Sequence, residues 1–363
     1  MHTEKMRIAL LNLPLDSNFG GNLQRYALIT FLKKLGYNIE HINLRINYQL
    51  PWYKIPFAYT KRIFLKVFRN DKRPIFLEKH LKETDYQKIQ AIDTFYKKYI
   101  PHTNAITKKT ELHKLASYDA YIVGSDQVWR KRMTCQLGLN TYFLDFVKNQ
   151  NAIKIAYSVS LGNSNNELTP KNIKHLRNLY KQFKAVSVRE DSALELFQHY
   201  QWMTPQAIHT VDPTFLLSKE DYIKLINAGN TISPDGDLFC YILDQNDEKE
   251  KVIQETAQKL DLKPFYITIN ENISIEQWLR AFHDSKYVIT DSYHGLVFSI
   301  IFNKPFLLLE NEKRGNARFE SILKMFNLKA NSEKYDWNYI NLTIKKEQER
   351  SIIFLQKALS ISE

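Results

Sequence analysis

The side chain best suited to acid–base chemistry in this sequence is His294, in the run TDSYHG at residues 290–295. Histidine is the commonest general acid or base near neutral pH. Asp291 and Ser292 are natural helix N-cap residues, so His294 would lie in the first turn of a helix that follows a strand. A purely structural histidine is the alternative that the residues leave open.

A second polar run, GSDQVWR at residues 124–130, follows the apolar stretch DAYIV. It contains a carboxylate (Asp126), an amide (Gln127) and an indole ring (Trp129). These groups exceed what a turn needs, and together they are typical of a site that binds a hydroxyl-rich ligand.

Three arginines are placed where they could hold an anion. Arg189 follows a strand in SVRE, and Arg314 and Arg318 precede a helix in EKRGNARFESIL. Arginine binds phosphate and carboxylate through paired hydrogen bonds. A salt bridge to a neighbouring carboxylate is an equal alternative for Arg189, and Asp212 in VDPT reads as a residue that ends a strand.

A glycine pair follows the first expected strand, in NFGGNLQRYAL at residues 18–28. Gly20 and Gly21 allow a tight turn, and Asn22 can cap the helix that begins there. The turn is not a dinucleotide-binding fingerprint, because G-x-G-x-x-G is absent. Taken alone, the pair is as consistent with a structural turn as with a ligand site.

The elements that would position these residues alternate between short β-rich runs and helical patterns. This alternation predicts an α/β fold with parallel sheets covered by helices, in which ligands bind at the carboxyl ends of the strands. We expect two Rossmann-like domains whose sheets face an interdomain cleft. The N-terminal domain would span residues 1–225, and residues 226–363 would form a C-terminal domain with TDSYHG and a terminal helix.

Length and composition are those of an ordinary globular protein. The chain has 363 residues, of which 44% are apolar, so two folded domains are expected and disorder is not. Two cysteines cannot form a disulfide framework, and no apolar run has the length of a signal sequence or a membrane span. These features predict a cytoplasmic protein.

The net charge of +12 is partly concentrated in an insertion at residues 46–117. Within it, residues 52–73 carry seven Lys and Arg side chains among aromatic residues, against Asp71 alone. This pattern predicts peripheral contact with an anionic membrane surface. The alternative is an amphipathic helix whose aromatic side chains face the core. No nucleic-acid-binding motif is present, so nucleic acid is not an expected partner.

These motifs, in this order, resemble the polysaccharide pyruvyltransferase family. The matching pieces are NFGGNLQRYAL, DAYIVGSDQVWR, KIAYSVSLG, VSVRED, VDPTFLL, SIEQWLRAFHDSKYVITDSYHGLVFSIIFNKPF and RGNARFESIL. The resemblance implies a GT-B-like fold and the transfer of pyruvate from phosphoenolpyruvate to two hydroxyls of one sugar, which forms a ketal and releases phosphate. It implies no metal or organic cofactor. The implied partners are phosphoenolpyruvate and a sugar or lipid-linked glycan.

The residues fit that chemistry. Protonation of the methylene carbon of phosphoenolpyruvate makes the adjacent carbon an electrophile, so an acid is needed, and His294 is the expected one. Asp126 is expected to accept a hydroxyl proton. The residues expected to bind the donor are Arg189, Arg318, Arg314 and Ser292, of which Ser292 stands where some family members carry an arginine. The residues expected on the acceptor side are Gly20, Gly21, Asn22, Gln24, Gln127 and Trp129.

Two other functions remain open at this point. A glycosyltransferase on the same architecture would use a nucleotide sugar and would have a nucleotide pocket in its C-terminal domain. A carbohydrate-binding protein without turnover would keep the fold and tolerate the loss of His294.

Overall fold

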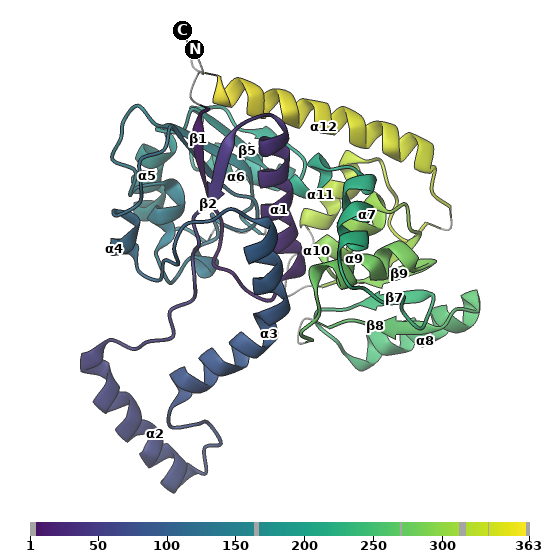
Figure 1. Cartoon of the computed structure of the whole chain (residues 1–363), viewed down its shortest axis with the longest axis horizontal. Helices are drawn as coiled ribbons and strands as arrows, with labels where there is room; N and C mark the ends of the chain where they lie inside the picture. The colour runs from purple at the N-terminus through teal and green to yellow at the C-terminus, as the bar shows by residue number, and fades with distance from the viewer. Residues whose placement is uncertain (1–4, 163–166, 269–270, 312–316, 333, 361–363) are drawn as a thin grey trace.

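The protein is described from a computed structural model that covers residues 5–162, 167–268, 271–311, 317–332 and 334–360. The chain forms two α/β domains that lie side by side, each around its own sheet (Figure 1). Every strand pairing within the two sheets is parallel. The expected fold class, two parallel-sheet domains in a GT-B-like arrangement, is therefore confirmed.

The N-terminal sheet has the strand order β2-β1-β3-β4-β5-β6. Helices cover both of its faces, so its central strands are mostly apolar, and all four side chains of β3 are buried. The strands are β1 (Arg7–Leu11), β2 (Asn38–His41), β3 (Ala120–Val123), β4 (Ile153–Val159), β5 (Ala185–Val188) and β6 (Ile208–His209).

Helix α1 (Phe19–Lys34) begins just after β1, so its N-terminus lies at the carboxyl edge of the sheet. The side chain of Asn18 caps it by accepting a hydrogen bond from the backbone N–H of Gly21. Outside the insertion the domain has two more helices, α5 (Pro170–Tyr180) and α6 (Asp191–His199), and the 3-10 turns η2 (Lys131–Met133), η3 (Leu139–Phe143) and η4 (Pro213–Leu216). The short helix α4 (Lys109–Leu112) lies near the end of the insertion.

The C-terminal sheet is smaller, with the strand order β10-β9-β7-β8. Its strands are β7 (Leu238–Tyr241), β8 (Pro264–Tyr266), β9 (Tyr287–Thr290) and β10 (Phe306–Leu308). Its helices are α8 (Asp247–Leu260), α9 (Ile275–Asp284), α10 (Tyr293–Ile301) and α11 (Ala317–Met325). Every residue of α10 is buried, which explains why its sequence is apolar on all sides.

Two further helices join the domains. Helix α7 (Lys219–Ala228) spans the predicted boundary at residues 225 and 226, and it packs against α9 of the C-terminal domain. Helix α12 (Trp337–Leu359) runs back over the N-terminal domain, where its Ser351 hydroxyl accepts a hydrogen bond from the backbone N–H of Val211 (Figure 1).

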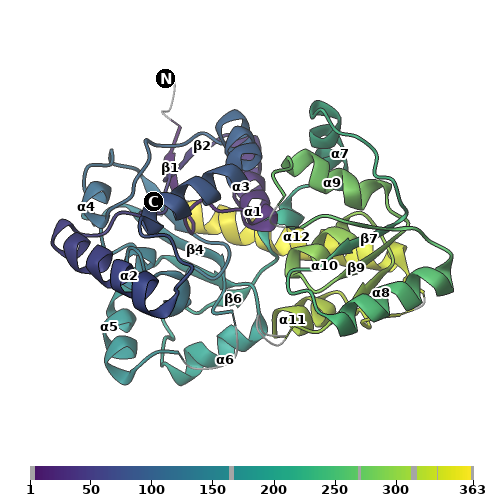
Figure 2. The same cartoon turned by 90° about the horizontal axis from the view of Figure 1, so that it is seen from below.

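The insertion contains η1 (Trp52–Lys54), α2 (Ile55–Arg69) and α3 (Leu77–Tyr99). The second half of α3 packs into the core through Ile92, Phe95 and Tyr96. Helix α2 has no buried residue; it lies below the N-terminal domain in Figure 1 and in front of that domain in Figure 2, which is seen from below. The alternative in which its aromatic side chains face the core is therefore wrong. Among the described residues, no helix is both long and apolar enough to cross a membrane.

Candidate functional site

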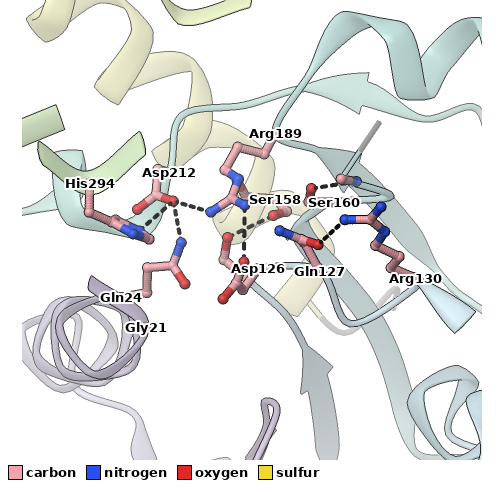
Figure 3. Close-up of polar contacts among 12 residues, drawn as sticks. Gly21, Gln24, Asp126, Gln127, Arg130, Ser158, Ser160, Arg189, Asp212 and His294 are labelled. Atoms are coloured by element: carbon pink, nitrogen blue, oxygen red, sulfur yellow. Dashed lines mark hydrogen bonds and ion pairs between the residues drawn. The ribbon is translucent and has the colours of Figure 1, made fainter. Parts of the chain in front are cut away.

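A cavity of about 380 Å³ lies between the two domains, at the carboxyl ends of their strands. The N-terminal domain contributes the loop after β1 and the loop after β3, and the C-terminal domain contributes the start of α10 and part of α11. Figure 3 shows the polar residues that meet beside this cavity. The cavity is the interdomain cleft that the sequence predicted.

Asp291 and Ser292 fix the turn that presents His294. The carboxylate of Asp291 is fully buried and accepts hydrogen bonds from the backbone N–H groups of Leu243 and Asp244, at 2.6 and 3.1 Å. Ser292 is the N-cap of α10, and its hydroxyl accepts a hydrogen bond from the backbone N–H of Gly295. The turn therefore holds the imidazole at the cavity wall, where His294 is 6% exposed.

Gly20 makes room for this imidazole from the opposite domain. A Cβ atom at Gly20 would lie 2.0 Å from Cγ of His294, far inside van der Waals contact. At Gly21 the nearest atom to such a Cβ would be 3.6 Å away, in Asn18. The two glycines of the predicted pair therefore differ. The close approach of His294 leaves no room for a side chain at position 20, whereas a Cβ atom at position 21 would meet only an ordinary contact.

Asp212 is the residue at the centre of the polar cluster, and the sequence analysis had read it as the end of a strand. Its Oδ2 atom accepts hydrogen bonds from Nε2 of Gln24 and, at 2.9 Å, from Nη1 of Arg189, and it lies 3.8 Å from Nε2 of His294 (Figure 3). Its Oδ1 atom accepts from the backbone N–H and hydroxyl of Thr214. Burial acts to raise the pKa of Asp212, but His294, Arg189 and Thr214 outweigh it and lower that pKa.

Arg189 is enclosed by carboxylates. Its side chain is fully buried, and its Nη1 and Nη2 atoms donate to Asp212 and to Oδ1 of Asp126, the latter at 3.1 Å. Burial opposes its charge, but Tyr293 and the two carboxylates raise the pKa of Arg189. Arg189 is not among the residues that line the cavity, so the structure places this predicted donor ligand behind the carboxylates.

Asp126 lies at the cavity with 18% of its side chain exposed. Burial acts to raise its pKa, but the positive charges of Arg189, His294 and Arg318 lower the pKa of Asp126. The residue is therefore ionised at neutral pH and faces the cleft, as a group that accepts a hydroxyl proton or hydroxyl hydrogen bonds must be.

The rest of the GSDQVWR run splits between the cavity and the core. Gln127 lines the cavity and accepts a hydrogen bond at 2.9 Å from Nη1 of Arg130. Trp129 is only 2% exposed, because its ring stacks on Phe143 at 4.4 Å and its Nε1 atom donates to the carbonyl of Tyr142. The expectation that Trp129 contacts an acceptor sugar is corrected: its indole belongs to the aromatic core.

Two predicted acceptor residues are also buried. Asn22 is 1% exposed, donates to the carbonyls of Asp16 and Asn18, and accepts from Arg25. Gln24 is 1% exposed and donates to Asp212. Neither side chain is among the cavity-lining residues, so both position the loop and the cluster instead of contacting a ligand in the cavity.

Arg318 and Ser292, both predicted at the donor, do line the cavity. The guanidinium of Arg318 lies 5.6 Å from the ring centre of Tyr293, on the same ring that Arg189 approaches at 4.4 Å. Burial and the charge of Arg189 lower the pKa of Arg318 to about 10. Arg314 lies outside the described residues.

The sequence analysis missed three kinds of residue at the cleft. Asp212 follows a strand as Arg189 does, and this position after a strand could have predicted its place in the site. Arg130 and Arg132 follow Asp126 in the chain, and the lining also includes Asp16 from the first loop. Arg132 is exposed, and its guanidinium forms no hydrogen bond or ion pair with any described residue. Within the described part of the chain, no three His, Cys, Asp or Glu side chains are grouped so as to hold a metal ion.

Comparisons with known proteins identify the family of this chain. A family model described as polysaccharide pyruvyl transferase matches residues 18–313, so the chain belongs to the polysaccharide pyruvyl transferase family. That membership supports transfer of pyruvyl groups in polysaccharide biosynthesis in general. No curated protein matches the sequence.

Solved structures similar to this chain include the UDP-GlcNAc 2-epimerase of Methanocaldococcus jannaschii, at 12% identity and a TM-score of 0.47, covering 97% of this chain and 100% of that one. The UDP-N-acetylglucosamine 2-epimerase of Rickettsia bellii is 11% identical, with a TM-score of 0.42 and 96% of each chain covered.

Proposed function

We propose that this protein transfers pyruvate from phosphoenolpyruvate to two hydroxyls of one sugar, forming a ketal and releasing phosphate. The observation that carries the proposal is the cluster at the cleft, in which a histidine at a helix start lies beside a buried carboxylate and faces a cavity lined by arginines. Family membership supports the same general activity.

In the proposed reaction His294 gives a proton to the methylene carbon of the donor, and the C–H bond forms as the C=C π bond is lost. A sugar hydroxyl attacks the neighbouring carbon and loses its proton, for which Asp126 is the nearby acceptor. The C–O bond to phosphate then breaks, and the second hydroxyl attacks the same carbon. Asp126 passes the first hydroxyl proton to the departing phosphate, and the proton of the second hydroxyl restores His294.

Asp212 supports the acid without touching the substrate. Its carboxylate offers an opposite charge to the protonated imidazole, and its other hydrogen bonds keep that carboxylate in place. Asp212 is thus a positioning residue for His294.

The proposed donor site uses arginines at the cavity surface in place of Arg189. Burial, and then the charge of Arg189, lower the pKa of Arg318, and a bound phosphate or carboxylate would offset both effects. Arg132 offers a guanidinium with no partner among the described residues. Together they supply the positive charge for an anionic donor.

The acceptor belongs to a cell-surface polysaccharide or to its lipid-linked precursor, and the proposed location is the cytoplasm, at the inner face of the membrane. No metal or organic cofactor is required by the chemistry proposed. A glycosyltransferase would instead need nucleotide phosphates in the C-terminal domain. The start of α8, beside a second cavity there, carries Asp247, Glu248 and Glu250, whose negative charges oppose phosphate.

A thermal-shift experiment with phosphoenolpyruvate and UDP separates the two enzymes. Phosphoenolpyruvate should raise the melting temperature, because a ligand that binds only the folded state stabilises it by about 2.7 kcal/mol at 100 times its Kd. Arg132→Gln should keep the unliganded melting temperature and reduce the shift, whereas Lys345→Gln on α12 should leave the shift unchanged. Stabilisation by UDP and not by phosphoenolpyruvate would replace this proposal with the glycosyltransferase.

A further inference from the structure

Residues 52–73, which contain η1, α2 and the segment after α2, are here called the arm. It exposes large apolar side chains that a folded protein normally buries: Trp52 is 82% exposed, Phe57 78% and Phe68 70%. No residue of η1 or α2 is buried. Apolar groups clustered on one exposed element mark an interaction surface.

The aromatic side chains of α2 form one face. Phe57, Phe64 and Phe68 are separated by seven and four residues, which places them on the same side of an α-helix, and the rings of Phe64 and Phe68 lie 4.6 Å apart. The opposite side is held by the protein itself, because Arg62 forms a two-point ion pair with Glu78 and Tyr59 packs edge-on against Phe76. The helix is thus secured on one side and open on its apolar side.

The arm also carries an excess of positive charge. Two of the seven basic residues are neutralised, because Arg62 pairs with Glu78 and Arg73 pairs with Asp71. The remaining five form no ion pair with any described residue: Lys54, Lys61, Lys66, Arg69 and Lys72. The arm therefore combines an open aromatic face with a surplus of unpaired positive charge.

We propose that the arm docks on an anionic lipid bilayer. The phenylalanine face would enter the boundary between headgroups and acyl chains, to a depth of about 5–10 Å, and the lysines would contact lipid phosphates. At 15 residues with four cations, α2 suits a helix that lies in the plane of the surface. A second copy of this chain is a poorer occupant, because two arms in contact would bring like charges together.

This inference stands apart from the proposed function, since it needs no assumption about donor or acceptor. Its consequence for that function is that the enzyme would be positioned at the membrane surface. If the acceptor is lipid-linked, the arm brings the enzyme to the surface that holds it.

The test uses the full chain in sedimentation with vesicles of phosphatidylcholine, alone or mixed with phosphatidylglycerol. At low salt the protein should bind the vesicles that contain phosphatidylglycerol and not those of phosphatidylcholine alone. This binding should weaken at high salt, because surface charges are screened. The combined variant Phe57→Ser, Phe64→Ser, Phe68→Ser should bind at least about tenfold more weakly, because three phenylalanines lose their burial in lipid. Its matched control on α12, Tyr339→Ser with Leu342→Ser, removes exposed apolar groups elsewhere and should bind like the wild type.

A second set of variants tests the contribution of charge by replacing three lysines that form no ion pair. Lys54→Gln, Lys61→Gln and Lys66→Gln together should weaken binding about 100-fold, whereas Lys345→Gln, Lys346→Gln and Lys357→Gln on α12 make the same charge change at another site and should matter little. Trp52 gives a spectroscopic reading, because it is the most exposed tryptophan and its emission should shift to shorter wavelength on the vesicles.

Three results would overturn the proposal. One is no sedimentation of the wild type with anionic vesicles at low salt. Another is equal loss of binding in the α2 and α12 variants, which would indicate a general charge effect. The third is a wild-type dimer that the phenylalanine variant converts to monomers while vesicle binding persists, which would assign the arm to a second copy of the chain.

Discussion

The cleft and the arm depart from ordinary burial in opposite ways. At the cleft the protein encloses charged groups, because the side chains of Asp212 and Arg189 are fully buried. His294 beside them is 6% exposed. On the arm it leaves phenylalanines and a tryptophan in water. Buried charges are costly unless paired, and exposed aromatic groups forgo the free energy of burial.

The two regions differ in whether their side chains already have partners within the protein. The buried carboxylates and Arg189 are paired with one another, so the side chains around His294 are already held in place before a ligand arrives. The arm has no such internal pairing for its five free cations, and nothing in the described part of the chain covers its apolar face. Single substitutions at the cleft should therefore change both turnover and the free energy of unfolding. Single substitutions on the arm should change neither.

The largest expected effect is on rate, at the cleft. His294→Gln keeps a hydrogen-bonding side chain of similar size but cannot supply an acidic proton, so turnover should fall about 100-fold to 10,000-fold. The affinity for phosphoenolpyruvate should change little. Turnover within about threefold of the wild type would remove His294 from the catalytic role, since it is far below that contribution.

The next effect is on stability. Asp212→Asn removes one of the two carboxylates that neutralise Arg189, and breaking a buried ion pair in this way should cost about 3–5 kcal/mol of unfolding free energy. Asp126→Asn, at a partly exposed site, should cost less. Chemical denaturation measures both, and equal losses would contradict the larger share assigned to the fully buried Asp212.

This stability should also depend on pH. Because the pKa of Asp212 is lower in the folded than in the unfolded protein, its contribution is complete above the unfolded value of about 3.9 and is lost as the pH falls toward the folded value. The gap between wild type and Asp212→Asn should therefore narrow below about pH 4. A gap that stays constant down to pH 2 would contradict the assigned pKa shift.

Gly20→Ala should have an intermediate effect. The added methyl group would overlap His294 and displace it, costing about 1–3 kcal/mol as overpacking does, together with part of the turnover. Gly21→Ala is the matched control, because the same methyl group meets only an ordinary contact there, and stability should stay within about 1 kcal/mol. Similar activity in the two variants would remove the proposed need for glycine beside His294.

The smallest effect is expected on the arm. Phe57→Ser should change the free energy of unfolding by no more than about 0.5 kcal/mol, because the ring has no partner in the core. Phe298→Ala, in the fully buried α10, should cost about 3–5 kcal/mol. A large loss from Phe57→Ser would mean that α2 packs against the body of the protein in solution.

Much of the fold was predictable, because local patterns determine it. Alternating apolar runs and helix starts predicted both parallel-sheet domains, and polar residues at strand ends predicted that His294 and Asp126 meet at one cavity. The likeness of the motifs to pyruvyltransferases is confirmed by the family match.

What the sequence did not predict depends on contacts between distant segments. Asp212 gains its role only because Gln24, Arg189 and His294, from three other elements, converge on it. Trp129 follows a strand as ligand-binding residues do, but the chain turns its ring into the aromatic core. Burial of a side chain after a turn is set by tertiary packing, which a local motif does not encode.

The central claim is that the cleft around His294 protonates phosphoenolpyruvate and passes its pyruvyl group to a sugar. The most direct measurement is mass spectrometry of candidate lipid-linked glycans after incubation with enzyme and phosphoenolpyruvate in D2O. The account predicts a glycan heavier by pyruvate less one water, with one deuterium in the new methyl group, because the imidazole proton exchanges with solvent. A ketal whose methyl group carries no deuterium, or no pyruvylated product from any of these glycans, would contradict it.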